Sequence, residues 1–169
     1  VMRQAVVADD LLRLLVSQAG ARVAVLGHTR WASVGIISEP NAHPVNSEEL
    51  EANANAAYLI AALNGDVDNH ADLRARHELR LAQPITTDAK VIPALVSRRL
   101  TQTAGSGLRG ASSGSSGATG SEVAAAVLTD AFRETVASFE GSVAIATASA
   151  DHPGALLLAL KGSGQGLCV

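Results

Sequence analysis

Apolar residues recur at helical spacing in several parts of the chain. In residues 2–18 they fall close to one face, and Gly20 is a plausible stop for the helix. Residues 122–138 show the same period in a longer segment. Two shorter helices are predicted, one over residues 70–79 capped by Asn69, and one that begins at Thr87 or Asp88 and ends near Leu100.

Shorter apolar runs bounded by turn residues predict five strands. They cover residues 22–27, 56–63, 80–85, 141–148 and 155–160. Asn64-Gly65 is a strong turn signal and is expected to end the second strand. Strands grouped with strands, beside a pair of adjacent helices, favour a layered α+β fold over strict βαβ alternation.

Two segments show neither period. Residues 28–47 carry Gly, Pro, Asn and Ser and are expected to form ordered turns. Residues 101–121 are rich in Gly, Ser, Thr and Ala, and they lack the apolar surface needed to offset the entropy of ordering. We therefore expect a flexible insertion over residues 103–120 inside one domain that spans residues 1–169.

Composition narrows the classes of function. The net charge of −3 argues against a nucleic-acid partner, and no apolar run approaches the roughly 20 residues of a membrane span. The single cysteine excludes an internal disulfide framework and fits a reducing, cytoplasmic setting. The five histidines lack metal-ligand spacing, and no Gly-rich phosphate loop is present, so neither a metal nor another cofactor is expected.

Three sites could carry chemistry. Arg30, in an irregular loop, could grip a carboxylate bidentately, although a solvated or structural arginine is the commoner case. Asn64-Gly65 could supply an amide side chain and a backbone N–H to an oxyanion, although the pair alone is usually a hairpin turn. Asp88 could bind a cation, or it could simply favour the start of a helix.

The order of three short motifs adds to this interpretation. They are Gly27-His28-Thr29-Arg30-Trp31-Ala32-Ser33, Asn41-Ala42-His43-Pro44 and Leu63-Asn64-Gly65-Asp66. Together they resemble the glutaminase domain of class II glutamine amidotransferases, in particular the glutamine–fructose-6-phosphate aminotransferase branch. The resemblance covers roughly residues 20–100 and, weakly, 139–169. It implies an Ntn-hydrolase-like αββα layered sandwich, here partial.

The resemblance also implies roles for individual residues. Arg30 would hold the α-carboxylate of glutamine and Asp88 its ammonium group, while Asn64 and Gly65 would be the oxyanion donors. Trp31, Ser33 and His43 would belong to the substrate pocket. For Trp31 a packing role is an even alternative, and for His43 loop-stabilising hydrogen bonds are as good an interpretation as catalysis.

Several positions depart from the family pattern. Val34 and Leu63 replace histidines that are usual in this branch, and Lys90 replaces an acidic residue. The family's nucleophile is an N-terminal cysteine, whereas Cys168 lies in an apolar terminal segment and is interpreted as a core residue. The chain therefore resembles a domain truncated at both ends and lacking its nucleophile.

The expected function is glutamine binding and ammonia release within a sugar-phosphate aminotransferase-like parent, with this segment alone inactive. The expected partners are L-glutamine and an isomerase-type synthase domain of the parent, which could also mediate a homodimer. Two alternatives stay open: a degenerate, non-catalytic binding or assembly module, and a domain of the amidophosphoribosyltransferase or asparagine synthetase type.

Overall fold

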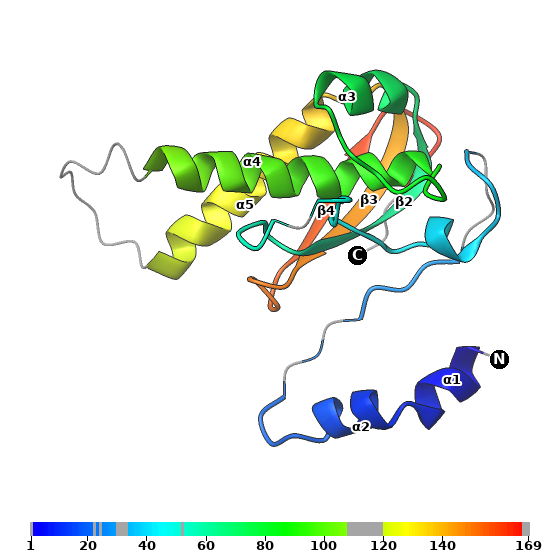
Figure 1. Cartoon of the computed structure of the whole chain (residues 1–169). Helices are drawn as coiled ribbons and strands as arrows, with labels where there is room; N and C mark the ends of the chain where they lie inside the picture. Colours follow the sequence, from blue (N-terminus) through cyan, green and yellow to red (C-terminus); the bar gives the residue numbers. More distant parts are fainter. Residues whose placement is uncertain are drawn as a thin grey trace.

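The chain folds around one antiparallel sheet with helices against one of its faces (Figure 1). The structure is a computed structural model, and it describes residues 2–21, 23, 25–29, 34–51, 53–107 and 120–166. The sheet has four strands in the order β1-β2-β3-β4. Their bounds are β1 (Val45–Asn46), β2 (Leu59–Val67), β3 (Gly141–Ser149) and β4 (Leu156–Lys161).

The two C-terminal strands agree with the expected ranges within one residue at each end, whereas three other strand predictions need correction. The strand expected at residues 56–63 continues through Asn64-Gly65, which pair with Ala144 and Val143, so these two residues form no hairpin turn. The described residues of 22–27 are not in a strand, and neither are residues 80–85. In the latter, Pro84 lacks a donor, and Arg80 N donates instead to the Glu49 side chain at 2.8 Å.

Two long helices cover one face of the sheet. Helix α4 (Val91–Gly107) packs against β2 and α5 (Gly120–Ala137) packs against β4, and the two helices also contact each other (Figure 1). The core between the helices and the sheet is built mainly from aliphatic residues. It includes Leu59, Leu63, Val67, Ile92, Leu95, Leu128, Phe132, Val143 and Ile145.

The opposite face of the sheet has no covering layer among the described residues. Cross-strand partners in an antiparallel sheet point to the same face, so the register defines three rows on it. The rows are Ile60–Ala148–Leu156, Ala62–Ala146–Leu158 and Asn64–Ala144–Leu160. The three leucines are 52%, 38% and 51% exposed, respectively. We call these nine residues the outer sheet face.

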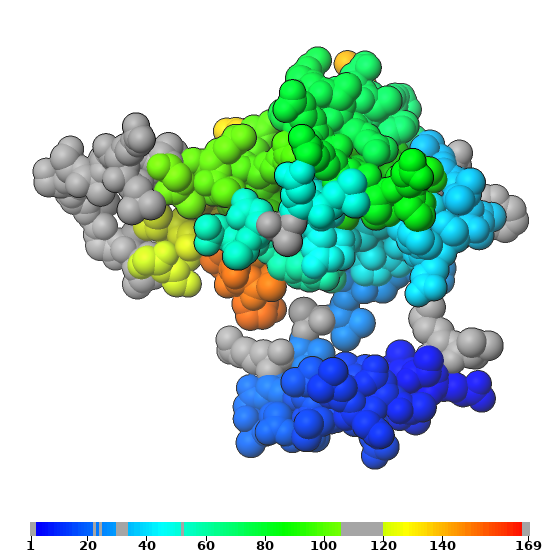
Figure 2. All heavy atoms as spheres, in the orientation of Figure 1, coloured from blue at the N-terminus to red at the C-terminus, as the bar shows by residue number. Residues whose placement is uncertain are grey.

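The N-terminal helix is interrupted. The helix expected over residues 2–18 is instead two short helices, α1 (Met2–Ala8) and α2 (Asp10–Val16). Asp9 separates them because its side chain caps α2, accepting from Leu12 N at 2.9 Å. Apolar side chains of both helices are exposed, and the pair lies apart from the sheet and the long helices (Figures 1 and 2).

Asn69 stands at the N-cap of α3 (His70–Arg76) but does not cap it through its side chain. Its amide instead donates to Ser138 O at 2.9 Å and accepts from Glu140 N at 3.0 Å. Asn69 thus ties the start of α3 to the segment between α5 and β3, because the tertiary partners compete with the local cap.

The expected insertion at residues 103–120 is described only at its edges. Residues 103–107 belong to the last part of α4, and α5 begins at Gly120. Residues 108–119 lie outside the described residues, so a flexible insertion stays a prediction. None of the helices in the described part of the chain is long and apolar enough to cross a membrane.

Candidate functional site

Four of the seven residues expected in the site are described. They are His43, Asn64, Gly65 and Asp88, whereas Arg30, Trp31 and Ser33 lie outside the described residues. His43 and Asp88 are brought to the same region, where the segment 35–43, the segment 84–88 and the second half of β2 meet.

Asn41 joins two of these segments. The residue ends the short helix η1 (Glu39–Asn41) and is buried, and its side-chain amide takes part in the four hydrogen bonds that follow. Nδ2 donates to Ser38 Oγ at 2.8 Å and to Pro84 O at 3.0 Å, while Oδ1 accepts from the backbone N–H groups of Thr86 at 2.7 Å and Thr87 at 2.9 Å. Asn41 therefore sets the path of the backbone that leads directly into Asp88.

A second contact holds the segment that follows the Gly27–Ser33 motif. Ile36 N donates to Thr86 Oγ1 at 3.2 Å. Gly35 has φ +83°, and a Cβ at this position would stand 2.9 Å from Thr86 Oγ1. Glycine is required here both for the backbone conformation and for the close approach. The chain leaving the first motif is thus packed on the residues just before Asp88.

His43 lies along the edge of β2, beyond the two-residue pairing with β1. Leu63 N donates to His43 Nδ1 at 3.4 Å, and His43 Nε2 lies 3.3 Å from Thr87 Oγ1. A backbone N–H can only donate, so Nδ1 must be the acceptor and the neutral ring carries its proton on Nε2. The His28 ring lies beside it, with a centroid separation of 5.0 Å, which places part of the first motif against the second.

Asp88 opens the short helix η2 (Asp88–Lys90) and is only 2% exposed. Oδ2 accepts from Val67 N at 2.8 Å and Oδ1 accepts from Thr87 Oγ1 at 3.4 Å. Burial raises the pKa of this carboxyl above its ordinary value, and Asp66 adds to the rise, while the Val67 N–H and His70 oppose it. Each carboxylate oxygen can accept more than one hydrogen bond, so the bonds from Val67 and Thr87 do not exhaust the capacity of Asp88 as an acceptor.

Asn64 and Gly65 lie within β2 rather than in a turn, as reported above. Gly65 has φ +104°, and a Cβ there would overlap Ser142 O. Glycine at this position therefore allows β2 and β3 to stay paired at a positive φ that residues with a side chain rarely adopt. Asn64 belongs to the outer sheet face and is exposed. The oxyanion role assigned to this pair stays a prediction.

Sequence reasoning noted Lys90 only as a departure, and the structure gives it a role. The side chain is fully buried, and Nζ donates to the backbone oxygen and to Oδ1 of Asn46, at 2.7 and 2.8 Å. Burial lowers the pKa of Lys90, and Glu48 and Glu49 partly oppose this. Lys90 thus connects η2 to β1 through hydrogen bonds. A residue that departs from the family pattern therefore has a structural role here.

Asn41 and Thr87 are site residues that sequence reasoning missed. Asn41 belongs to the Asn-Ala-His-Pro motif, and Thr87 precedes Asp88, so both stood next to recognised positions. Their roles depend on segments more than 40 residues apart in the chain, as the bonds from Asn41 to Thr87 and from His43 to Thr87 show. A motif can mark such residues but cannot say which partners they meet.

This geometry suits recognition of a small cation. A buried carboxylate with two donors has a defined orientation, and a charge-assisted bond to an ammonium group would be strong in such surroundings. Within the described residues, no group of three or more His, Cys, Asp and Glu side chains could hold a metal ion.

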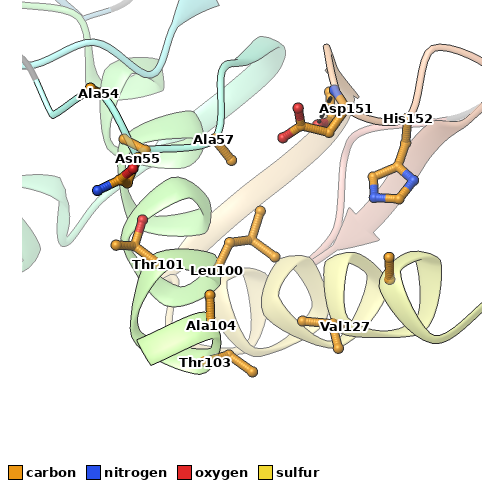
Figure 3. Close-up of a pocket in the computed structure, with 13 residues that line it drawn as sticks. Ala54, Asn55, Ala57, Leu100, Thr101, Thr103, Ala104, Val127, Asp151 and His152 are labelled. Atoms are coloured by element: carbon orange, nitrogen blue, oxygen red, sulfur yellow. Dashed lines mark hydrogen bonds between the residues drawn. The ribbon is translucent and has the colours of Figure 1, made fainter. Parts of the chain in front are cut away.

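A hollow of about 550 Å³ lies elsewhere, beside the second half of α4 (Figure 3). Leu100 and Val127 form apolar parts of its wall, and Asp151 and His152 contribute from the turn between β3 and β4 (Figure 3). It contains none of the residues expected in the site.

The comparisons with known proteins agree with the motifs. No protein-family model matches the chain. It is 31% identical over 151 residues to the glutamine–fructose-6-phosphate aminotransferase (isomerizing) of Thermosynechococcus vestitus, covering 83% of this chain and 20% of that protein. It is 34% identical over 138 residues to the enzyme of the same name from Mycolicibacterium smegmatis, covering 80% and 18%.

Among solved structures, the chain is similar to the glutamine phosphoribosylpyrophosphate amidotransferase from B. subtilis complexed with ADP and GMP. The TM-score is 0.48 and the identity 18%, over 79% of this chain and 22% of that one. The chain thus spans about a fifth of the length of the curated relatives it matches. By the sequence matches, it is a distant homologue of the glutamine amidotransferase region of the glutamine–fructose-6-phosphate aminotransferases.

Proposed function

We propose that the chain is the glutamine-binding part of a glutaminase domain, which releases ammonia from L-glutamine for transfer to a phosphosugar in a sugar-phosphate aminotransferase-like protein. The observation that carries the proposal is the burial and orientation of the Asp88 side chain. It is a buried carboxylate, oriented by Val67 N and Thr87, in a segment that follows the three motifs along the chain. The two sequence relatives named above are glutamine–fructose-6-phosphate aminotransferases, which supports the same assignment.

The roles follow from the chemistry of each side chain. Asp88 would accept the α-ammonium group of glutamine, and Arg30 would form a bidentate pair with the α-carboxylate. Trp31, Ser33 and His43 would complete the pocket around the bound amino acid. Asn64 and the Gly65 N–H would donate to the oxygen of the side-chain amide once that oxygen becomes negatively charged.

The proposed reaction is a nucleophilic substitution. A cysteine thiolate supplied from outside residues 1–169 would attack the side-chain amide carbon, and its amino group would act as the base. The tetrahedral intermediate would expel ammonia, leaving a thioester that water hydrolyses to glutamate and free thiol. Cys168 lies outside the described residues and receives no role in this scheme.

A non-catalytic binding module is the second candidate, and the departures from the family pattern favour it. Leu63 is part of the hydrophobic core, so the usual histidine there is replaced by a packing residue. Lys90 is buried and occupied by Asn46, so it takes no part in ligand binding. An active enzyme and a binding module would both bind glutamine, but only the enzyme would release ammonia.

We also propose that the complete domain is an αββα sandwich. The outer sheet face supports this, because its apolar rows resemble the inner face of a two-sheet core. A second sheet, formed by other parts of the protein, would cover these rows. A synthase domain that accepts the ammonia, a homodimer formed through it and a cytoplasmic location complete the proposal.

Glutamine affinity tests the proposed pocket. In the complete gene product, Arg30→Ala and Asp88→Ala should each weaken glutamine binding by roughly tenfold or more, because each removes one charge-assisted hydrogen bond. Calorimetry gives the Kd whether or not the protein is catalytic. Asp130→Ala is the control, because Asp130 is an exposed residue of α5 that pairs with Arg133.

If both variants keep the parental affinity, the glutamine-pocket assignment is wrong. Ammonia release is measured in parallel, since it separates the enzyme from the binding module. Residues 1–169 alone should release none.

A further inference from the structure

Both oxygens of the Asp88 carboxylate receive a donor, and one of these donors belongs to a longer series of hydrogen bonds. The series runs from Leu63 N to His43, from His43 to Thr87, and from Thr87 to Asp88 Oδ1. Thr87 is buried, so water does not compete with these bonds.

The direction of the series follows from its first member. Leu63 N–H donates to His43 Nδ1, so His43 donates from Nε2 to Thr87 Oγ1. The Thr87 hydroxyl then accepts from His43 and has its own proton free to donate to Asp88 Oδ1. A protonated carboxyl on Oδ1 would oppose this direction, so the series favours the carboxylate form of Asp88.

We propose that Thr87, oriented by His43, is a positioning residue that keeps the Asp88 carboxylate ionised and aimed at the ammonium group of the bound amino acid. The inference rests on the proposed function. The two links to Thr87 are long, at 3.3 and 3.4 Å, as hydrogen bonds in ligand-free sites often are, and they would shorten when the ammonium group binds.

Other charged groups act on Asp88 as well. Asp66 in β2 favours the protonated carboxyl, whereas the backbone N–H groups of Val67 and Ala89 and His70 in α3 favour the carboxylate. None of these contacts passes through Thr87. The contribution of Thr87 can therefore be separated from theirs by a substitution at Thr87 alone.

Two substitutions isolate the hydroxyl. Thr87→Val keeps the branched shape and removes the hydroxyl, whereas Thr87→Ser keeps the hydroxyl and removes a methyl group. Thr129→Val is the control, because Thr129 is exposed on α5 and its hydroxyl donates to Ala125 O of the same helix at 2.9 Å, outside the site. Each variant of the complete gene product is first checked for folding by its Tm.

In the complete gene product, Thr87→Val should weaken glutamine binding by roughly tenfold, while Thr87→Ser and Thr129→Val should change the Kd by less than about threefold. The acidic limb of the binding pH profile should also move to higher pH in Thr87→Val, because Asp88 then loses a donor that favours its charged form. A variant that only loosened the fold would not move this limb.

A second ligand makes the test specific for the ammonium group. Glutaramate, 4-carbamoylbutanoate, is glutamine without its α-ammonium group, so its binding should not depend on Thr87. The parent protein and Thr87→Val should bind glutaramate with affinities within about twofold of each other. Equal weakening for glutamine and glutaramate would overturn the inference and leave Thr87 a purely structural residue.

The inference and the proposed function fail differently. If Asp88→Ala weakens glutamine binding but Thr87→Val behaves like Thr129→Val, the inference is wrong and the pocket assignment stands. If the parent protein does not bind glutamine, or Asp88→Ala has no effect, both are wrong.

Discussion

At the scale of single residues, Asp88 shows a conflict between stability and binding. The side chain is almost fully buried, and burial raises the pKa of its carboxyl. Keeping this group charged inside the protein costs free energy, which a ligand ammonium group would offset on binding. Binding sites of this kind often lower the stability of the folded protein, so a substitution that removes the charge can raise it.

Asp88→Asn should therefore stabilise the ligand-free chain at neutral pH by about 0.5–2 kcal/mol, a range common for single stabilising substitutions. The asparagine oxygen can still accept from Val67 N, and its amide can donate to Thr87 Oγ1. Tm measured at pH 7 would show the gain. The same variant should bind glutamine at least tenfold more weakly.

The pH dependence has a definite sign. Because the pKa of Asp88 is higher in the folded than in the unfolded chain, its contribution to stability is full below the ordinary aspartate value of 3.8. That contribution is lost as the pH rises through the folded-state pKa. The advantage of Asp88→Asn should thus vanish near pH 3–4 and grow toward pH 7, and a constant difference across this range would contradict the interpretation.

At the scale of elements, the sequence predicted best where one face of a segment is buried. The helix expected at 122–138 and the strands expected at 141–148 and 155–160 differ from α5, β3 and β4 by at most two residues at either end. The errors lie where a side chain competes with the local pattern, as Asp9 and Asn69 do, or where a short apolar run finds no strand partner, as in residues 80–85. The period of apolar residues indicates which face of a segment is buried, but it does not indicate which strand the segment pairs with.

In the candidate site, too, the sequence predicted some features and missed others. The sequence singled out His43 and Asp88 separately, and only the folded loops bring them to one region through the hydrogen bonds of Asn41 and Thr87. The Asn-Gly pair misled, because its usual meaning is a turn and here Gly65 lies in a strand at a positive φ. A local signal is ambiguous when the residue is used for tertiary packing.

Lys161 links two elements at this scale. Lys161 Nζ, at the end of β4, donates to the carbonyl oxygens of Val136, Ala137 and Phe139 at 3.3, 2.8 and 2.5 Å. It therefore satisfies the C-terminal carbonyls of α5 and places a positive charge at the negative end of the helix dipole. The lysine joins the last strand to the helix that covers it.

Lys161→Met should destabilise the chain by about 1–2 kcal/mol, because the methionine keeps the apolar stem but leaves the carbonyls without this donor. The Tm should fall by roughly 2–8 °C. Arg133→Met, in α5, is the control, since Arg133 is exposed and pairs with exposed Asp130, so its loss should matter by less than about 0.5 kcal/mol. Equal effects of the two substitutions would refute the capping role.

At the scale of the whole molecule, the outer sheet face is the feature that the described residues do not explain. Its centre is the row Ala62–Ala146–Leu158, flanked by the rows that contain Leu156 and Leu160. An apolar sheet face of this kind is normally covered by a second layer, and exposed patches of this kind promote association. In the sandwich proposed above, the four-stranded sheet with helices on one side would be one half.

Leu158→Lys tests this arrangement in two settings. In the complete gene product, a charge in the middle of a sheet-to-sheet core should cost about 3 kcal/mol or more and lower the Tm accordingly, because it would be buried without a partner. In residues 1–169 alone, the same side chain is partly exposed, so the substitution should change stability little. It should also reduce self-association, measured by analytical ultracentrifugation, because it interrupts the apolar rows.

Val123→Lys, at an exposed position of α5, is the control and should be tolerated in both settings. If the complete gene product tolerates Leu158→Lys as well as Val123→Lys, no second sheet covers this face and the sandwich proposal fails.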